Sequence, residues 1–247
     1  MTDFTNDIRR FLEAHHYESF EPRAALIDMD GVLYDSMPGH ARAWQQMATS
    51  HGIECTFEEF FGYEGMTGPA TINILFNRAF GRNATADEVK ALYKEKSDNF
   101  SAQGLPPKMP GFDSVMATLR ERGLSRVLVT GSGQRSLIDR IAADYPGAFP
   151  PGMAVTGADV AHGKPDPEPY LKAMKLADVK PWQSIVIENA PCGVTAGARS
   201  GAFTVGVATG PIPLEELAKA GAAVTFASMP DFAEALPTLL DQLANAH

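Results

Sequence analysis

The stretch AALIDMDGVLYDS, residues 24–36, decides how the rest of the chain is organised. Its first four residues form a short apolar run followed by a turn signal, which is typical of a strand buried on both faces of a parallel sheet. Asp28 and Asp30 come at the carboxyl end of this strand, where open α/β sheets bind their ligands. Side chains two positions apart on an extended backbone point the same way, so both carboxylates are expected to face one ligand. Taken alone, Asp-x-Asp-Gly is equally typical of an ordinary turn, so the remaining sequence must decide between the two.

The composition is that of a globular protein. The chain has 247 residues, of which 45% are hydrophobic and 21% charged, enough for one large domain or a domain with a sizeable insertion. The formal net charge of −9 argues against nucleic acid or an anionic membrane as partner. Cys55 and Cys192 do not make a disulfide framework, and residues 1–20 lack the apolar core of a signal peptide. We expect a cytoplasmic protein, monomeric or a weak homo-oligomer.

Helical signals surround the first strand. Apolar residues at helical spacing from Phe4 to Leu12 predict a helix over 4–20, with Pro22 ending it. Further apolar residues, spaced four, three and four apart from Met37 to Ala48, predict another.

The next part of the chain shows helices and no convincing strand. Thr56 with Glu59, and Thr85 with Glu88, fit the capping box and predict helix starts near 57 and 86. The proline-rich stretch 106–111 resembles a stiff linker. We therefore expect an inserted α-helical cap domain over 38–108.

From Gly111 onward, helices alternate with short apolar runs. Expected helices are 112–122, one after Gly133 that carries Leu137, Ile138 and Ile141, 167–176 and 192–200; expected strands are 126–130, near 154, 184–187 and 203–207, with weaker elements beyond. Such alternation predicts a parallel sheet covered on both faces. The expected fold class is α/β, a Rossmann-like doubly wound core over 1–37 and 109–247 with the cap inserted.

Polar residues follow four of these segments, and parallel strands that lead into helices end at one edge of the sheet. They are Asp28 with Asp30, Thr130-Gly131-Ser132, Lys164, and Glu188-Asn189. Each has an ordinary alternative: Thr130-Gly-Ser-Gly as a helix-start turn, Lys164 as a solvated loop lysine, and Glu188-Asn189 as a strand-end cap. Their joint order favours one shared site.

The order DMDGVLYDS, VLVTGSG, GKPDPEPY and VIENAPCGVTAGARSG resembles the haloacid dehalogenase superfamily of phosphohydrolases that carry a helical cap. Asp35-Ser36 followed by His40, Arg42 and Trp44 resembles its β-phosphoglucomutase-like subfamily. The resemblance extends from Ala24 over nearly all of the remaining chain and excludes the first 20 residues.

The resemblance implies roles for the four motifs. Asp28 matches the nucleophile that forms an aspartyl phosphate, and Asp30 matches the general acid/base. A dehalogenase expels a halide that needs no proton, so Asp30 argues against that reaction. Thr130, with Gly131 and Ser132, would bind phosphate oxygens, and Lys164 would neutralise the nucleophile and the transferring group.

Charge counting then predicts a metal. Asp28, Asp30 and Glu188 contribute −3, and Lys164 returns the site only to −2. Mg²⁺ held by Asp28, the Asp30 carbonyl, Glu188 and Asn189 would offset this charge with the oxygen ligands it prefers.

Two departures from the resembling proteins concern the cap. Many of them have a second acid where this chain has Asn189; Glu64, in a glycine-rich stretch, is the candidate to replace that charge at the Mg²⁺ site, and a solvated loop acid is the alternative. Sugar-phosphate mutases usually have an arginine where Gly68 stands.

Other cap residues are expected near the substrate. Arg78, Arg82 or Lys94 would have to replace the missing arginine, although each also suits a helix surface. Thr67 and His40 are expected to bind substrate at the cleft between cap and core. Trp44 is expected to pack, and Cys192 to be a small buried residue.

The predicted function is Mg²⁺-dependent hydrolysis of a small phosphate ester or anhydride, such as pyrophosphate, through phospho-Asp28. A β-phosphoglucomutase-type isomerase is the first alternative and a non-catalytic ligand-binding module the second. A P-loop kinase is disfavoured because no G-x-x-x-x-G-K-[ST] occurs. The expected partner is a small phosphorylated metabolite or pyrophosphate.

Overall fold

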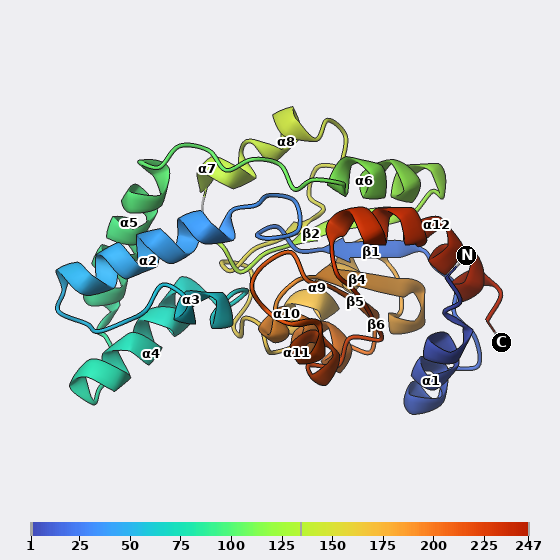
Figure 1. The fold of residues 1–247 in the computed structure, drawn as a ribbon, viewed down its shortest axis with the longest axis horizontal. Coiled ribbons are helices and arrows are strands. Elements are labelled where there is room, and N and C mark those ends of the chain that lie inside the picture. Colours follow the sequence, from blue (N-terminus) through green and yellow to red (C-terminus); the bar gives the residue numbers. More distant parts are fainter. Residues whose placement is uncertain (1, 134, 247) are drawn as a thin grey trace.

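A computed structural model describes residues 2–133 and 135–246, and its centre is a six-stranded parallel sheet (Figure 1). The strand order is β3-β2-β1-β4-β5-β6. The strands are β1 (Ala24–Ile27), β2 (Ser125–Val129), β3 (Ala154–Val155), β4 (Ser184–Glu188), β5 (Phe203–Val207) and β6 (Val224–Phe226). All neighbouring pairs run parallel, and the chain order reverses at β1, next to β4. The expected doubly wound α/β fold is confirmed.

Alternate residues of β1 enter two different apolar clusters, because successive side chains of a strand point to opposite faces. Ala25 and Ile27 join a cluster with α1 (Thr5–His15), α6 (Phe112–Glu121) and α12 (Met229–Ala244). Ala24 and Leu26 join another with α9 (Glu168–Ala177) and α10 (Pro191–Arg199). Helices therefore cover both faces. The remaining core helices are α7 (Arg135–Ile138), α8 (Ile141–Asp144), α11 (Leu214–Lys219) and the 3-10 turn η1 (Pro181–Gln183).

Residues 37–101, which we call the helical segment, lie beyond the carboxyl ends of the strands (Figure 1). They form α2 (Met37–Ser50), α3 (Glu59–Gly62), α4 (Gly68–Phe80) and α5 (Ala86–Ser101), and the structure describes all of them without a strand. Phe60, Ile72, Leu75 and Leu92 belong to an apolar cluster separate from those of the sheet. The domain boundaries at 37/38 and 108/109 stay a prediction.

The two connections between the sheet and the helical segment lie side by side. Tyr34 pairs with Lys108 in an isolated antiparallel bridge. The Met109 N–H donates to the Leu33 carbonyl at 2.8 Å, and the Tyr145 hydroxyl donates to the same carbonyl at 2.5 Å. The chain therefore leaves and re-enters the core at one place.

Two expected helices differ from those observed. The helix expected over 4–20 ends at His15, not at Pro22, because His16 adopts a left-handed conformation with φ of 56°. Tyr17 then donates its N–H to Leu12 O, which closes the end of the helix. The single helix expected after Gly133 is two short ones, α7 and α8.

Both predicted capping boxes form. Thr85 and Glu88 exchange side-chain and backbone hydrogen bonds at the start of α5. Thr56 and Glu59 do the same, but the helix that follows them, α3, is only four residues long.

Candidate functional site

The four polar motifs meet at the carboxyl edge of the sheet, on the side that faces the helical segment. Asp28 follows β1, Thr130 follows β2, and Glu188 is the last residue of β4. A cavity of about 50 Å³ lies between these strand ends and the helical segment. Residues from both parts line it, among them Asp28, Asp30, Thr130, Gly131 and Ser132 from the core and His40, Glu64, Tyr93 and Lys96 from the helical segment.

A buried ion cluster lies at the centre of this edge. Lys164 Nζ lies 2.5 Å from Asp28 Oδ1 and 2.6 Å from Glu188 Oε1, and it also donates to Val129 O at 3.1 Å. Asp28, Lys164 and Glu188 are each at most 3% exposed. The reading of Lys164 as a solvated loop lysine is therefore wrong.

Burial and surplus negative charge change the proton affinities of this cluster. Burial, together with the nearby carboxylates of Glu188 and Asp30, raises the pKa of Asp28 to about 8, although Lys164 opposes the shift. Burial acts to lower the pKa of Lys164, but Asp28 and Glu188 raise it above its ordinary value, so this lysine stays charged. The cluster is thus short of positive charge.

Glu188 is held on both of its oxygens. Oε1 accepts from Lys164 and from the Tyr170 hydroxyl, the latter at 2.8 Å. Oε2 accepts from the backbone N–H groups of Asn189 and Ala190 at 3.0 and 3.3 Å. These four contacts match the number of hydrogen bonds a carboxylate accepts, so Glu188 fixes Lys164 and the loop after β4. Sequence reasoning missed Tyr170, which stands in the expected third motif.

The backbone of the loop after β2 packs directly against the backbone of the helical segment. Thr130 is anchored by its N–H to Val155 O at 2.9 Å, and its hydroxyl oxygen accepts from the Ser132 N–H at 3.0 Å. A Cβ on Gly131 would lie 2.4 Å from Gly65 O, so only glycine allows this approach. Thr130 and Gly131 both line the cavity.

Asp30 is held by a chain of side chains that reaches into the helical segment. Its Oδ1 accepts from the Ser36 hydroxyl at 2.6 Å and lies 2.9 Å from His40 Nε2. His40 Nδ1 lies 2.7 Å from Lys96 Nζ, and the His40 ring stacks on Phe100 at 4.0 Å between centroids. Burial acts to raise the pKa of Asp30, but His40, Ser36 and Lys96 lower it below its ordinary value.

Lys96 is a second residue that sequence reasoning missed. It is 3% exposed, and its ammonium lies within 6 Å of the ring centroids of Trp44, Tyr93 and Phe100. Burial lowers the pKa of Lys96 to about 8. A signal was present, because Leu92, Lys96 and Phe100 are spaced four apart and therefore share the buried face of α5.

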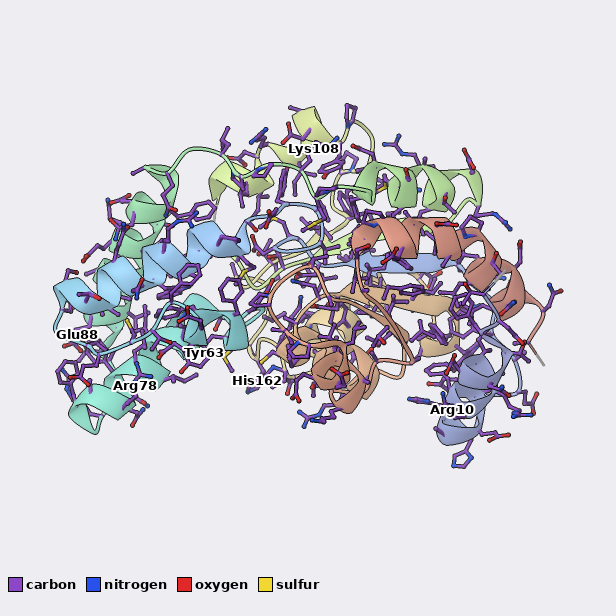
Figure 2. The ribbon with its side chains drawn as sticks, viewed as in Figure 1. Arg10, Tyr63, Arg78, Glu88, Lys108 and His162 are labelled. Atoms are coloured by element: carbon purple, nitrogen blue, oxygen red, sulfur yellow. The ribbon has the colours of Figure 1, made fainter. Side chains whose placement is uncertain are left out.

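The three cations considered for the missing arginine do not reach the cavity. Arg78 pairs with Glu59, Arg82 with Glu88, and Lys94 with Asp98, all on the surface of the helical segment. Figure 2 shows Arg78 and Glu88 at the end of the helical segment that lies away from the sheet. Their alternative interpretation as surface residues is the right one.

Glu64 lies at the interface between the helical segment and the core. It is 5% exposed, and its Oε1 accepts from Asn189 Nδ2 at 2.7 Å. Burial, followed by repulsion from Asp28, Glu188 and Asp30, raises the pKa of Glu64 well above its ordinary value, although Asn189 opposes the shift. The alternative of a solvated loop acid is therefore wrong.

Tyr93 occupies the space next to Gly68. Its hydroxyl accepts from the Gly133 N–H at 2.9 Å, and a Cβ on Gly68 would lie 2.2 Å from the Tyr93 ring. A longer side chain at position 68 would collide with this ring. Thr67, expected to bind substrate, has its methyl group against Gly163, where an added Cβ would lie 2.6 Å away, and its role stays a prediction.

Trp44 and Cys192 were expected to have structural roles only. Trp44 packs in the apolar cluster of the helical segment and also lines the cavity. Cys192 is half-buried instead of buried, and its Sγ lies 3.9 Å from Gly62 O in α3. It is thus a contact between α10 and the helical segment.

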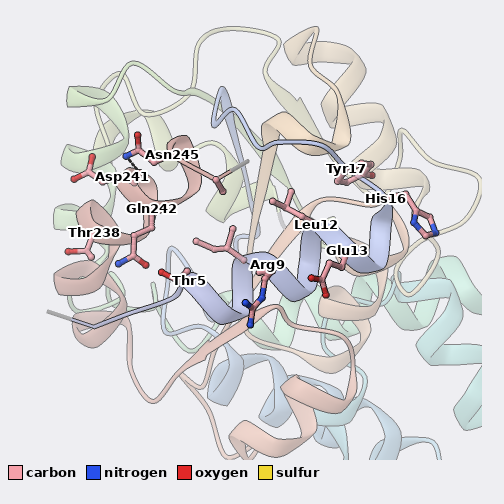
Figure 3. Close-up of a pocket in the computed structure, with 12 residues that line it drawn as sticks. Thr5, Arg9, Leu12, Glu13, His16, Tyr17, Thr238, Asp241, Gln242 and Asn245 are labelled. Atoms are coloured by element: carbon pink, nitrogen blue, oxygen red, sulfur yellow. Dashed lines mark hydrogen bonds between the residues drawn. The ribbon is translucent and has the colours of Figure 1, made fainter.

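A wider groove elsewhere lacks such chemistry. It has a volume of about 940 Å³ and lies between α1 and α12. Figure 3 shows Thr5, Leu12, Asp241 and Gln242 among its lining side chains. Convergent buried carboxylates and a lysine occur in the smaller cavity, which is therefore the better candidate site.

Comparisons with known proteins agree with this geometry. The sequence model of the haloacid dehalogenase-like hydrolases matches residues 22–201. The chain belongs to the haloacid dehalogenase-like hydrolase family. It is thus an enzyme of a family whose members include phosphatases and phosphoglucomutases.

Within this family the chain resembles several named proteins. It is 28% identical over 182 residues to hexitol phosphatase A of Escherichia coli, covering 74% of this chain and 81% of that one. It is 26% identical over 196 residues to β-phosphoglucomutase of Bacillus subtilis, covering 76% and 84%. A solved structure of a "putative beta-phosphoglucomutase" from Bacteroides vulgatus has a TM-score of 0.94 and 44% identity, covering 97% of this chain and 98% of that one.

Haloacid dehalogenase-like phosphatases generally use Mg²⁺, and the residues of this site fit that ion. Among the described residues, Asn189 Oδ1 is a buried side-chain oxygen that accepts no hydrogen bond. Its orientation is fixed because Nδ2 of the same amide donates to Glu64. Asp28 and Glu64 supply carboxylates, so the set offers hard oxygen donors. Among the described residues, no group of three or more His, Cys, Asp or Glu side chains is arranged so that it could hold a metal ion by itself.

No helix in the described part of the chain is long and apolar enough to cross a membrane.

Proposed function

We propose that the chain is a Mg²⁺-dependent phosphohydrolase that acts on a small phosphate anhydride or ester, with pyrophosphate as the favoured substrate. The observation that carries this proposal is the bond between Glu64 and Asn189, which closes the site over a cavity of about 50 Å³. The Glu64 side chain occupies volume in this cavity and, once ionised against a bound cation, adds negative charge that disfavours a second phosphate.

Asp28 is the proposed nucleophile. A carboxylate oxygen attacks phosphorus, the bond to the leaving oxygen breaks, and an aspartyl phosphate forms. The Lys164 ammonium, 2.5 Å from Asp28, attracts the phosphoryl oxygens, while Thr130 and Gly131 donate hydrogen bonds to them. Mg²⁺ held by Asp28, the Asp30 carbonyl, Asn189 Oδ1 and Glu64 would offset the charge of the incoming phosphate, while Glu188, whose oxygens already accept four hydrogen bonds, would add negative charge nearby.

Asp30 is the proposed general acid and then base. Its protonated form, which the lowered pKa makes the minor one, gives its proton to the leaving oxygen, and the carboxylate then removes a proton from the water that hydrolyses phospho-Asp28. Ser36 and His40 hold its Oδ1, so the second oxygen is the one positioned for proton transfer. Lys96 contacts His40 and so connects Asp30 to α5 of the helical segment.

The size of the leaving group is limited by Glu64 and Tyr93. Both project from the helical segment into the closed cavity, and Tyr93 is held there by its bond to the Gly133 N–H. Among the described residues that line the cavity, Lys96 is the single lysine or arginine. One ammonium beside a small space suits a leaving phosphate better than a leaving sugar.

A β-phosphoglucomutase-type isomerase remains the second candidate, supported by the likeness to the Bacteroides vulgatus and Bacillus subtilis proteins. A mutase must retain a bisphosphate while it reorients. Gly68, with the Tyr93 ring against it, leaves no room for the arginine that the resembling mutases use. This favours hydrolysis.

A metal-dependent screen tests the proposal. Purified protein is assayed for phosphate release from pyrophosphate, hexose phosphates and small phosphate esters, with Mg²⁺ and with EDTA. We expect Mg²⁺-dependent release that is most efficient with pyrophosphate. Conversion of β-glucose 1-phosphate to glucose 6-phosphate that exceeds hydrolysis, with a bisphosphate activator, would establish the mutase instead. Phosphate release unchanged by EDTA would contradict the metal-dependent mechanism.

A further inference from the structure

The loop between β5 and α11, residues 208–213, contacts the helical segment although it belongs to the core. Ile212 packs against the apolar cluster of the helical segment, which includes Phe60 and Phe61. A Cβ on Gly210 would lie 3.9 Å from Phe61 Cδ1, so the ring lies directly against this loop. Figure 1 shows α3, which carries Phe61, on the inner side of the segment, facing α10 and α11. The loop is thus a docking point for α3.

Phe61 connects this loop to Glu64. Phe61 is 6% exposed, and its carbonyl accepts the N–H of Glu64 at 3.4 Å in the turn after α3. Because Glu64 follows Phe61 by only three residues, the position of the buried Phe61 ring constrains the position of the Glu64 backbone and side chain. The contact between Ile212 and this cluster therefore influences how closely the Glu64 side chain approaches Asn189.

The same loop also holds the other side of the Glu64 contact. The Thr209 hydroxyl donates to Gly31 O at 2.6 Å. Gly31 lies directly beside the Glu64–Asn189 hydrogen bond, since an added Cβ would be 1.9 Å from Asn189 Nδ2 and 2.7 Å from Glu64 Oε1. Thr209 thus fixes the backbone against which Glu64 and Asn189 meet.

We propose that the 208–213 loop is a closure clamp in which Thr209 and Ile212 are positioning residues that hold Glu64 against the metal site. The inference rests on the proposed function in one respect, the assignment of Glu64 as a group that binds the cation. The clamp acts on a backbone carbonyl through Thr209 and on an apolar cluster through Ile212. Neither residue is among those that line the cavity.

Binding of Mn²⁺ alone, followed by electron paramagnetic resonance, tests the clamp without relying on turnover. We expect Glu64→Ala to weaken Mn²⁺ binding by more than tenfold, and Ile212→Ala and Thr209→Val by about threefold to tenfold, less than the roughly ten- to hundredfold found for residues bonded directly to metal ligands. In the double variant Ile212→Ala/Glu64→Ala, Mn²⁺ binding should equal that of Glu64→Ala alone, because the clamp acts through Glu64. Circular dichroism confirms that each variant is folded.

Val179→Ala is the matched control, because Val179 is another partly buried residue, packed on the cluster of α9 away from the helical segment. It should lower the melting temperature with Mn²⁺ affinity unchanged. The clamp is overturned if Ile212→Ala and Thr209→Val bind Mn²⁺ like the unsubstituted chain, or if the effects of Ile212→Ala and Glu64→Ala add. A Glu64→Ala variant with unchanged Mn²⁺ affinity also overturns it. If no substrate released phosphate while the variants kept the expected order of Mn²⁺ affinities, the proposed function would be wrong and the clamp would stand.

Discussion

Asn189 Nδ2 donates a hydrogen bond to Glu64 Oε1 at 2.7 Å, and this bond joins the end of β4 to the helical segment. An amide at position 189 can serve both neighbours, since its nitrogen donates to the carboxylate and its oxygen stays available to a cation. An aspartate there would face Glu64 with like charge. The exchange of an acid for Asn189 and the presence of Glu64 are therefore one arrangement, not two independent departures.

Glu64→Ala should lower the rate of pyrophosphate hydrolysis far more than that of a bulky sugar phosphate. The substitution removes the proposed carboxylate ligand of the cation and also widens the cavity, and the second effect partly offsets the loss for a large substrate. The ratio of kcat/KM for pyrophosphate to that for a hexose phosphate should fall by at least about tenfold. Glu54→Ala, at an exposed position of the same segment, is the control. Equal losses on both substrates would discard the role of Glu64 in substrate size.

Asp28→Asn should abolish turnover while the fold is kept. An amide cannot form the aspartyl phosphate, and loss of the nucleophile is expected to reduce kcat by at least about a thousandfold. Rapid quench with labelled substrate should detect acid-stable label on the unsubstituted chain and none on the variant. The exposed Asp35→Asn is the matched control and should keep full activity. Substantial activity of Asp28→Asn would remove Asp28 from the nucleophile position.

Lys96→Met should separate activity from stability. Burial lowers the pKa of Lys96 to about 8, so the charged form is held at a cost, and a methionine of similar volume suits the surrounding rings of Trp44, Tyr93 and Phe100. The melting temperature should stay equal or rise, while kcat falls about a hundredfold because His40 loses its partner. Lys94→Met, at the exposed Lys94–Asp98 pair, should change neither. A parallel loss of stability and activity would show that Lys96 is only structural.

Tyr93→Ala should broaden the substrate range. Removing the ring frees the space beside Gly68, so hexose phosphates gain access while pyrophosphate loses the close fit. We expect a higher kcat/KM for glucose 6-phosphate and a lower one for pyrophosphate, together with a loss of about 2–4 kcal/mol in the free energy of unfolding. Tyr93→Phe, which removes only the hydroxyl bonded to Gly133, should keep the preference for pyrophosphate. An unchanged ratio in Tyr93→Ala would show that another group limits the size of the substrate.

Mg²⁺ should raise the melting temperature of the unsubstituted chain, because binding to the folded state stabilises it by about 2.7 kcal/mol at one hundred times the dissociation constant. Asn189→Leu removes the buried oxygen that accepts no hydrogen bond, and the shift should then largely disappear. Asn99→Leu, at a position outside the residues that line the cavity, is the control. A full shift in Asn189→Leu would exclude this amide as a ligand.

The strand ends could be predicted from the sequence because each is a local pattern. A buried apolar run followed by a polar turn located Asp28, Thr130 and Glu188, and the parallel topology brought them together. Lys164 needed the four motifs in order, since a lysine before proline has no local signal that distinguishes it from a surface residue. The structure places it 2.5 Å from Asp28.

The contacts of the helical segment were harder to predict, because they depend on how two parts of the chain meet. Arg78 and Arg82 were reasonable candidates by charge, yet both find acidic partners on their own surface. Lys96 was overlooked although it stands on the apolar face of α5. A lysine on the buried face of a helix is rare, so Lys96 was a better candidate for a buried site than the exposed cations.

The side-by-side connections at Tyr34 and Lys108 suggest how this enzyme could be redesigned. A stretch whose two ends are already hydrogen-bonded neighbours can be exchanged as a cassette, since a replacement needs only to bridge the same short gap. The proposed phosphoryl-transfer groups Asp28, Thr130 and Lys164 all belong to the core and would remain in the recipient chain. Chimaeras that carry the corresponding helical segment of a hexose-phosphate-specific relative on this core would then combine the donor's preference for larger substrates with the recipient's chemistry.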